Sequence, residues 1–268
     1  MFLDIEGLNK RFVRSARKGM QELHALEDID LQVEGGEFVT IIGPSGCGKS
    51  TLLNCVAGLT EHDSGSIRLD GVELTGPGPE RAVIFQQASL LPWRTVEQNV
   101  AYGLQLRRRF SSDEIARRVE RVITLVGLSG FEHHYPHEIS GGMQQRANVA
   151  RALAIEPRLV LMDEPFGALD ALTREMLQDE LSALAGRMEQ TTLFVTHDIE
   201  EAIFLGDRVV AMSTAPGRII ADLAVPFSRP RTRDVTDTEG FKSLVRELRL
   251  LLRPAERTSL PEGGVAAS

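Results

Sequence analysis

Short apolar runs, separated by longer segments with helical periodicity, recur along most of the chain and predict an α/β fold. Apolar residues occupy successive positions within these runs, which is typical of strands buried on both faces of a parallel sheet. We expect such strands over residues 37–42, 82–85, 158–162, 192–196 and 208–212, with an edge strand over 217–225. The pattern therefore predicts one mixed, mainly parallel sheet.

The N-terminal segment has a different pattern and predicts a small antiparallel sheet. Residues 3–12 indicate a short strand, and residues 24–33 alternate apolar and polar positions, as a half-exposed strand does. The polar, basic residues 13–22 between them predict a loop or the tip of a hairpin. Another short strand is expected over 66–69, before an Asp-Gly turn.

Helical periodicity replaces the short apolar runs near residue 88. The segment from Ser111 or Ser112 predicts an amphipathic helix, because its apolar residues recur every three or four positions. A further helix is expected after Ser140, whose side chain can cap the helix N-terminus. We therefore expect an all-helical insert over about residues 88–157.

The chain changes character again after Pro226, so we expect residues 1–225 to form one domain and residues 226–268 to follow it as an appendage. Polar residues dominate the first part of this appendage and predict a linker. A short amphipathic helix is expected over 241–253. The last residues combine Pro, Gly, Ser and charged side chains, and we expect them to be disordered.

The sequence GPSGCGKST, from Gly43 to Thr51, matches the phosphate-binding pattern G-x-x-x-x-G-K-[ST] at every fixed position. Glycines let the backbone curl around an anion, and the free N–H groups of the following helix attract it. A glycine-rich turn that binds nothing is the alternative, and the complete match between a strand and a helix disfavours it. The candidate residues are Gly43, Pro44, Ser45, Gly46, Cys47, Gly48, Lys49, Ser50 and Thr51.

Polar side chains follow two other predicted strands at the edge where parallel sheets bind ligands. Asp163 and Glu164 follow one apolar run, and His197 follows the next. One of the adjacent acids can hold Mg²⁺ through its water shell while the other polarises an attacking water. Lys49 supplies positive charge to phosphates, and the Ser50 hydroxyl can ligate Mg²⁺. A purely structural role is the alternative for His197, and its place at this edge disfavours it.

Two further features each permit two interpretations. The helix start at Ser140-Gly141-Gly142 exposes backbone N–H groups and predicts a second anion site, although these residues can also serve only as a turn and cap. Phe12 ends the first predicted strand, where it can stack on an adenine ring or fill an ordinary core or edge position.

The composition narrows the functional classes. The formal charge of −8 does not indicate a general affinity for nucleic acid. Two cysteines in 268 residues are too few for a disulfide scaffold and suggest reduced thiols in a cytosolic setting. No apolar run approaches the roughly 18 residues of a membrane span, so we expect any membrane association to occur by docking.

In their order and spacing, these motifs resemble those of the ATP-binding cassette (ABC) ATPases over about residues 3–225. Ile139 stands where that family more often has Leu, a conservative apolar change. The matching elements are the phosphate loop, Gln86 after a strand, the helix start Ser140–Gln144, the acids Asp163 and Glu164, the sequence Gly167-Ala168-Leu169-Asp170, and His197. The resemblance implies a P-loop NTPase core with an N-terminal β subdomain and a helical subdomain.

The resemblance also implies ATP and Mg²⁺ as cofactors and assigns the residues that hold them. Phe12 would stack on adenine, while Lys49 and the loop amides would hold the phosphates. Mg²⁺ would be ligated by Ser50 and Gln86, with Asp163 acting through a bound water.

The same resemblance assigns catalysis to Glu164, Lys49 and His197. Glu164 would be the general base for water, and His197 would link it to the γ-phosphate. The ATP of a second subunit would be bound by Ser140, Gly141, Gly142 and Gln144, with Asp170 at the subunit contact. We therefore expect a head-to-tail homodimer with two ATP molecules between the copies.

The resemblance implies that the dimer opens when ATP is hydrolysed. It also implies that this motion acts on a membrane permease. The apolar stretch Ala88–Trp93 predicts a groove for a short permease helix, unless it packs within the insert. Leu90–Trp93 and residues 215–219 also resemble the nitrate, sulfonate and taurine group of importers, and the same resemblance covers thiamine-precursor transporters. We expect a peripheral ATPase at the cytoplasmic face of the inner membrane, served indirectly by an extracytoplasmic binding protein.

A soluble ABC ATPase acting on nucleic acid or the ribosome is the alternative. Such proteins typically carry two cassettes or a long coiled coil, whereas this chain has one cassette, no heptads and an acidic balance. The sequence therefore favours the importer and predicts no nucleic-acid partner.

Overall fold

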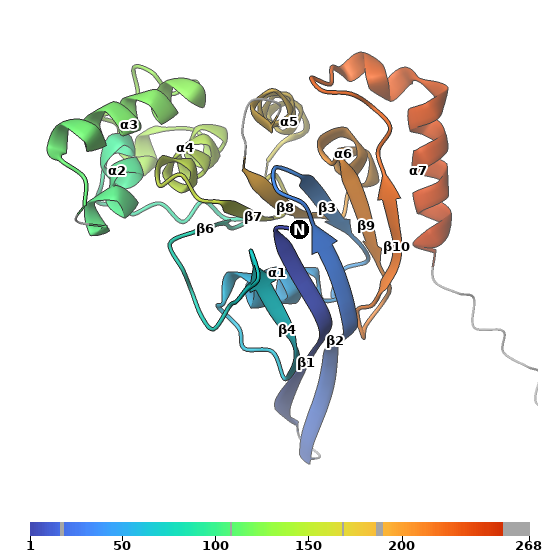
Figure 1. Ribbon diagram of the computed structural model, residues 1–268. Helices are drawn as coiled ribbons and strands as arrows, with labels where there is room; N and C mark the ends of the chain where they lie inside the picture. The colour runs from blue at the N-terminus through green and yellow to red at the C-terminus, as the bar shows by residue number, and fades with distance from the viewer. Residues whose placement is uncertain (17–18, 108, 168, 186–189, 254–268) are drawn as a thin grey trace, which may run out of the picture.

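The computed structural model describes residues 1–16, 19–107, 109–167, 169–185 and 190–253. Its main sheet has six strands in the order β10-β9-β3-β8-β7-β6 (Figure 1). The strands are β3 (Phe38–Ile42), β6 (Arg81–Ile84), β7 (Leu159–Asp163), β8 (Thr191–Thr196), β9 (Arg208–Met212) and β10 (Ile219–Ala224). All neighbours pair in parallel except β10, which is antiparallel to β9. The predicted mixed, mainly parallel sheet is confirmed.

A second, antiparallel sheet has the order β2-β1-β4-β5. Its strands are β1 (Leu3–Ala16), β2 (Gly19–Val33), β4 (Ser64–Leu69) and β5 (Val72–Glu73). The segment 13–22, predicted as a loop or hairpin tip, is mostly strand, with Val13 opposite Glu22 and Ser15 opposite Met20. Here β1 and β2 run past the end of their neighbour β4 as a two-stranded arm, in which the polar sequence does not interrupt backbone pairing (Figure 1).

Helix α1 (Lys49–Ala57) lies between the two sheets. Its residues Leu52, Leu53 and Val56 are fully buried against apolar side chains from both sheets. Successive side chains of a strand point to opposite faces, so Leu161 of β7 joins this core while its neighbour Met162 joins the core on the other face. The phosphate loop is therefore held between two packed layers.

The predicted helical insert contains α2 (Val96–Leu106), α3 (Ser112–Leu125), a short 3₁₀ helix (Pro136–Glu138) and α4 (Gly141–Ala154). These helices form a separate group at one side of the sheets (Figure 1). Thr95, Ser111 and Ser140 cap α2, α3 and α4 with side-chain oxygens, which confirms the cap predicted at Ser140.

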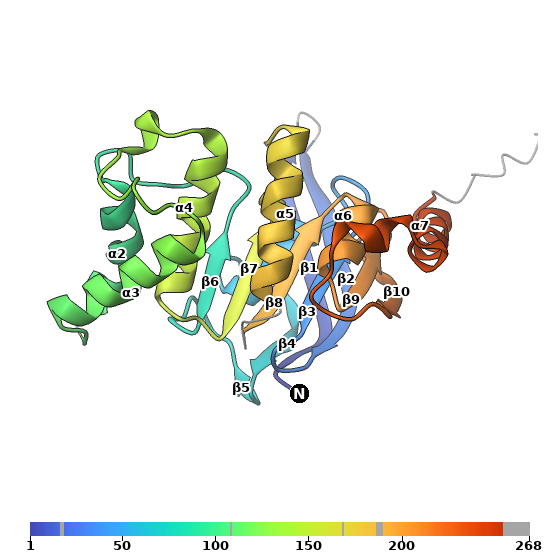
Figure 2. The ribbon, with the colours of Figure 1, turned by 90° about the horizontal axis from the view of Figure 1, so that it is seen from above.

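Helices α5 (Ala171–Ala185) and α6 (Ile199–Leu205) cover the face of the main sheet opposite α1, and α7 (Glu239–Leu251) packs beside α6 (Figure 2). Phe241 and Leu248 of α7 are buried in the same apolar core as Phe204 of α6. The predicted amphipathic helix is therefore docked on the main domain. The tail predicted to be disordered, 254–268, lies outside the described residues.

The segment predicted as a polar linker also packs closely. The buried Arg231 guanidinium donates hydrogen bonds to the carbonyl oxygens of Ile203, Phe204 and Gly206 at 3.0, 3.1 and 2.6 Å. Burial lowers the pKa of Arg231 to about 10, so the side chain remains charged at neutral pH. Arginine here caps the C-terminal end of α6, which the composition of the segment did not reveal.

Within the described part of the chain, no helix combines the length and hydropathy needed to cross a membrane.

Replacing Arg231 with Met should leave these carbonyl groups buried without a donor. We expect the free energy of unfolding to fall by about 1–3 kcal/mol, the cost of an unsatisfied buried acceptor. Chemical denaturation measures this loss. Arg246→Met is the control, because Arg246 is exposed and its nearest carboxylate, Glu239, lies 3.7 Å away. Equal stabilities of the two variants would contradict the capping role.

Candidate functional site

The predicted site residues follow the C-terminal ends of β3, β7 and β8, which lie at one edge of the sheet because these strands are parallel. A pocket of about 280 Å³ opens at this edge. Its lining combines the phosphate loop with the N-terminal arm: Phe12, Leu23, His24, Ala25, Ser45, Gly46, Gly48, Lys49, Ser50, Thr51, Glu164 and Ala215.

The phosphate loop curls through two glycines with positive φ, Gly46 at 77° and Gly48 at 103°. A side chain at Gly48 would also collide with the chain, because its Cβ would lie 2.6 Å from the carbonyl oxygen of Ala25. The Lys49 ammonium is buried inside the curl and donates to the carbonyl oxygens of Gly43 and Pro44 at 2.8 and 3.1 Å. The loop therefore encloses one fixed positive charge at the start of α1.

Cys47 fills the inner side of the same loop. Its thiol is buried and lies 3.9 Å from the Lys49 ammonium. Burial raises the pKa of Cys47, and the nearby Lys49 opposes this shift. A Cβ at Gly43 would lie 2.8 Å from the Cys47 sulfur, so the two residues fit only as glycine and a small side chain.

Ser50 and Asp163 meet at the mouth of the loop. The Ser50 hydroxyl donates to Oδ1 of Asp163 at 2.9 Å. Burial raises the pKa of Asp163, while the hydrogen bond from Ser50 acts against it. Hydroxyl and carboxylate oxygens are the donors that Mg²⁺ prefers, so the pair fits this ion.

Glu164 and His197 form the second pair of the site. Nδ1 of His197 lies 3.0 Å from Oε2 of Glu164, and Glu164 also lines the pocket. Glu164 has a φ of 44°, an uncommon value for a residue with a side chain, and its N–H donates to the carbonyl of Val195 at 2.9 Å. The main chain is thus held in a strained conformation that turns this carboxylate toward His197 and the pocket.

Phe12 is half-buried and belongs to the pocket wall, with the Lys10 ammonium 5.3 Å from its ring centroid. Its main-chain partner across the hairpin is Leu23, which lines the same pocket. The structure therefore places this ring beside the phosphate loop.

Gln86 and Asp170 lie outside the pocket lining. The Gln86 amide faces Gly167, where an added Cβ would lie 3.0 Å from Nε2. The Asp170 carboxylate accepts the Thr173 N–H at 3.0 Å at the start of α5, and this hydrogen bond lowers the pKa of Asp170. Ala168, between them in sequence, lies outside the described residues.

The second glycine block begins α4. Ser140 Oγ accepts the N–H of Met143 at 3.3 Å, and Gln144 Nε2 donates to the carbonyl of Pro136 at 2.8 Å. Gly142 lies against α5, because its Cβ would be 2.6 Å from a methyl carbon of Thr173. Within the described chain, the block does not share the pocket of the phosphate loop. The two predicted anion sites are therefore separate on one copy of the protein.

Sequence reasoning missed four residues of the pocket wall: Leu23, His24, Ala25 and Ala215. The first two follow from the register of the long hairpin, which brings them opposite Phe12 and Arg11. A strand prediction extended through residues 13–22 would have found them. Ala215 carries no local signal.

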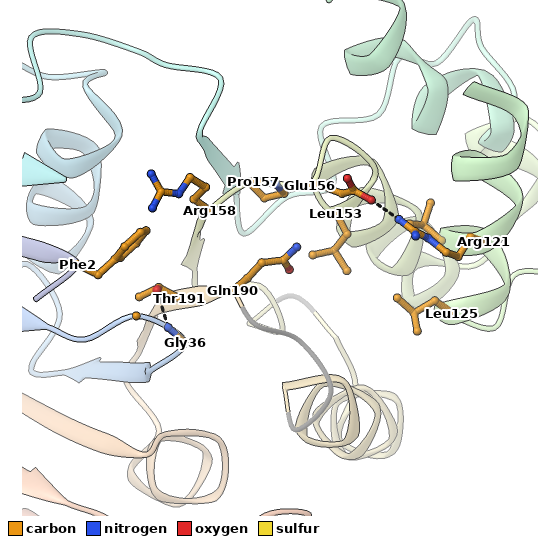
Figure 3. Close-up of a pocket in the computed structure, with 12 residues that line it drawn as sticks. Phe2, Gly36, Arg121, Leu125, Leu153, Glu156, Pro157, Arg158, Gln190 and Thr191 are labelled. Atoms are coloured by element: carbon orange, nitrogen blue, oxygen red, sulfur yellow. Dashed lines mark hydrogen bonds and ion pairs between the residues drawn. The ribbon is translucent and has the colours of Figure 1, made fainter. Parts of the chain in front are cut away.

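A larger pocket of about 800 Å³ lies at the opposite, N-terminal edge of the main sheet (Figure 3). Its wall includes Thr191 of β8, Arg121 of the helical insert, and Phe2, Gly36 and Arg158 from the segments just before β1, β3 and β7. Arg121 there is paired with Glu156 (Figure 3). None of the predicted site residues lines this pocket in the described structure, so size alone does not locate the site.

Three features define a P-loop ATPase: a glycine loop that encloses a lysine, a serine paired with a half-buried aspartate, and a glutamate paired with a histidine. Comparison with known proteins identifies the family within this class. Residues 26–167 match the family model described as ABC transporter.

Several curated relatives cover most of the chain. It is 48% identical over 212 residues to the nitrate import ATP-binding protein NrtD of Synechococcus elongatus, covering 78% of this chain and 77% of the relative. It is 46% identical over 236 residues to the aliphatic sulfonates import ATP-binding protein SsuB of Bacillus cereus, covering 87% and 91%. The taurine import ATP-binding protein TauB of Yersinia pestis is 47% identical over 205 residues, covering 76% and 80%.

A solved structure agrees with this assignment. The dimeric ATP-binding cassette MJ0796, in a post-hydrolysis state bound to ADP and Pi, superposes with a TM-score of 0.71 at 30% identity, covering 84% of this chain and all of that one. The chain therefore belongs to the ABC transporter family. It binds ATP and is the ATP-hydrolysing subunit of a transporter, and the soluble alternative is not favoured.

Alanine at Gly48 should weaken ATP binding by at least about tenfold, equivalent to about 1.4 kcal/mol. The added methyl combines a disfavoured positive φ with the collision against Ala25. Gly46→Ala is the matched control, because Gly46 also has positive φ but has open space around it. Titration with a fluorescent ATP analogue measures both. Equal affinities would show that the close approach at Gly48 is unimportant.

Proposed function

We propose that this chain is the ATPase subunit of a bacterial ABC importer, in which a head-to-tail homodimer couples ATP binding and hydrolysis to a membrane permease. The observation that carries the proposal is the pairing of Glu164 with His197 at 3.0 Å beside the phosphate loop. In this proposal, residues 1–225 are the nucleotide-binding domain and about 88–157 its helical subdomain, followed by the appendage 226–268.

The phosphate side of the pocket would bind ATP electrostatically. Lys49 and the loop N–H groups would hold the β- and γ-phosphates, and Phe12 would stack on the adenine from the arm. Ser50 and Gln86 would ligate Mg²⁺, with Asp163 acting through a bound water. Mg²⁺ would neutralise charge that develops on the phosphates.

Glu164 would act as the general base that takes a proton from the attacking water. His197 faces its carboxylate and would contact the γ-phosphate, which would link the phosphate to the base. Both side chains are partly exposed, which leaves room for the water.

The second glycine block would complete the site of another copy. Ser140, Gly141 and Gly142 start a helix of 14 residues, whose first N–H groups are suited to a phosphate. Because this block and Gln144 do not share the pocket of their own chain, they would bind the ATP held by the partner, with Asp170 at the contact. The dimeric state of the relative MJ0796 supports this arrangement.

The permease would dock on the stretch Leu90–Trp93. Trp93 is the only tryptophan of the chain, and 71% of its surface is exposed. The turn behind it is rigid, because the fully buried Asn99 side chain accepts the N–H of Leu91 at 2.7 Å and donates to the carbonyl of Arg94 at 3.0 Å. An exposed aromatic side chain on a fixed turn is typical of a contact surface.

We assign the importer to the nitrate, sulfonate and taurine group, because the named relatives are import ATP-binding proteins for nitrate, aliphatic sulfonates and taurine. The subunit would bind at the cytoplasmic face of the plasma membrane through its permease. An extracytoplasmic binding protein would select the substrate, which never contacts this chain.

Glu164→Gln should lower the rate of ATP hydrolysis by about 10²–10⁴-fold, the contribution of a general base, because the shape is kept while the proton acceptor is lost. Steady-state phosphate release measures the rate, and gel filtration should show ATP-dependent dimers that persist. Glu200→Gln is the control, since Glu200 is an exposed acid in the first turn of α6. A normal rate in Glu164→Gln would exclude Glu164 as the base.

Replacing Leu91 and Trp93 with Gln should abolish transport and co-purification with the permease while ATP hydrolysis by the isolated subunit persists. The matched control is Leu106→Gln, since Leu106 is an exposed apolar residue at the other end of α2. Uptake of radiolabelled taurine or sulfonate by cells and affinity purification from detergent-solubilised membranes provide the readouts. Unchanged transport would place the docking surface elsewhere, and recovery of ribosomes or DNA in place of a permease would overturn the importer.

A further inference from the structure

The C-terminal segment contacts both ends of α6, the helix whose N-cap residue directly follows His197. Arg231 binds the carbonyl groups at the C-terminal end of α6, as described above, and Arg249 of α7 reaches Glu200 at its N-terminal end at 3.2 Å. Between them, the Arg233 guanidinium lies 4.4 Å from the ring centroid of Phe204. The family model ends at residue 167, well before this segment.

The same helix carries a buried carboxylate, that of Glu201. Glu201 of α6 is only 7% exposed, and burial raises its pKa. Its Oε1 accepts from Nε2 of Gln178 at 2.7 Å, and its Oε2 accepts from the hydroxyl of Thr196. Both carboxylate oxygens therefore act as acceptors, an arrangement that an amide at position 201 cannot reproduce.

Thr196 connects Glu201 to the active site, because Thr196 directly precedes His197 in the chain. Its hydroxyl also accepts the N–H of Asp198 at 3.0 Å, and Asp198 in turn caps α6 by accepting the N–H groups of Glu200 and Glu201. Side chains on both sides of His197 therefore fix the backbone from which its ring reaches Glu164.

Gln178 connects the same carboxylate to α5. This helix follows the loop after Glu164, and its Arg174 donates to the carbonyl oxygens of Phe166 and Leu169 at 3.3 and 2.9 Å. The hydrogen bond between Gln178 and Glu201 thus joins the helix that follows the base to the helix that follows the histidine.

Arg233 of the C-terminal segment binds Gln178 and is the outermost residue in this series of contacts. Its Nη2 donates to Oε1 of Gln178 at 3.0 Å, which leaves the amide nitrogen of Gln178 directed at Glu201. Nε of Arg233 donates to Oδ1 of Asp179 at 2.6 Å, and Nη2 also binds the Glu175 carbonyl at 2.8 Å. The C-terminal segment therefore sets the orientation of the Gln178 side chain.

We propose that the C-terminal segment positions His197 for hydrolysis through the contacts Arg233–Gln178–Glu201–Thr196. Arg233 and Glu201 are positioning residues, since neither lines the nucleotide pocket in the described structure. This inference rests on the proposed role of His197 at the γ-phosphate. It assigns the appendage a function in turnover and none in ATP binding.

The test compares Arg233→Met with Arg249→Met, which removes an exposed contact to the same helix. We expect Arg233→Met to lower kcat for ATP hydrolysis about tenfold while KM for ATP stays within about twofold, because misalignment of a catalytic group costs up to about 10² in rate. Arg249→Met should retain both constants. A merely structural loss would lower the melting temperature without this separation of kcat from KM.

Gln178→Leu is the second variant, because it breaks the contact with Glu201 while Arg233 keeps Asp179. It should reproduce the loss in kcat, and it decides the matter if Arg233→Met does not fold by circular dichroism. Wild-type kcat in a folded Arg233→Met or Gln178→Leu would overturn the inference. His197→Ala tests the proposed role of His197 separately from its positioning by the C-terminal segment. Wild-type hydrolysis in that variant would overturn the proposed role of His197 itself.

Discussion

Parallel pairing of β3, β7 and β8 is the constraint on which the site depends. It brings the loop after β3, the acids after β7 and the histidine after β8 to one edge, although the loop is more than 100 residues from the other two in sequence. Apolar side chains on both faces fix this register, because a slip of one residue would exchange the two cores. The sheet itself thus sets the distances within the site.

Two buried charges with opposite tasks lie within this framework. Lys49 is held by backbone carbonyls inside the loop, ready to exchange them for phosphate oxygens. Glu201 is held by neutral donors away from the pocket, where it joins α5 to α6. The first charge acts on the nucleotide, and the second stabilises the geometry around the residue that faces the base.

Local patterns predicted what local chemistry determines. The phosphate loop, the Ser140 cap and the acids after β7 each depend on residues close in sequence, and the structure places them as the sequence indicates. The extended arm was missed because its run of polar residues is typical of a loop, and the sequence does not show which backbone segments pair. The contacts of Arg231 and Arg233 with α5 and with the end of α6 were missed because these partners lie 25 or more residues away, and a run of polar residues does not reveal which arginine will be buried.

The arm formed by β1 and β2 has a consequence for nucleotide choice. Its pairing with β4 ends at Asn9 and Ser64, so Phe12 and Leu23 stand on two strands without a third. A two-stranded ribbon is marginally stable alone and yields to a different ring more readily than the packed phosphate side does. In the proposed binding mode, recognition would therefore depend on the triphosphate more than on the purine, and discrimination between ATP and GTP would be weak.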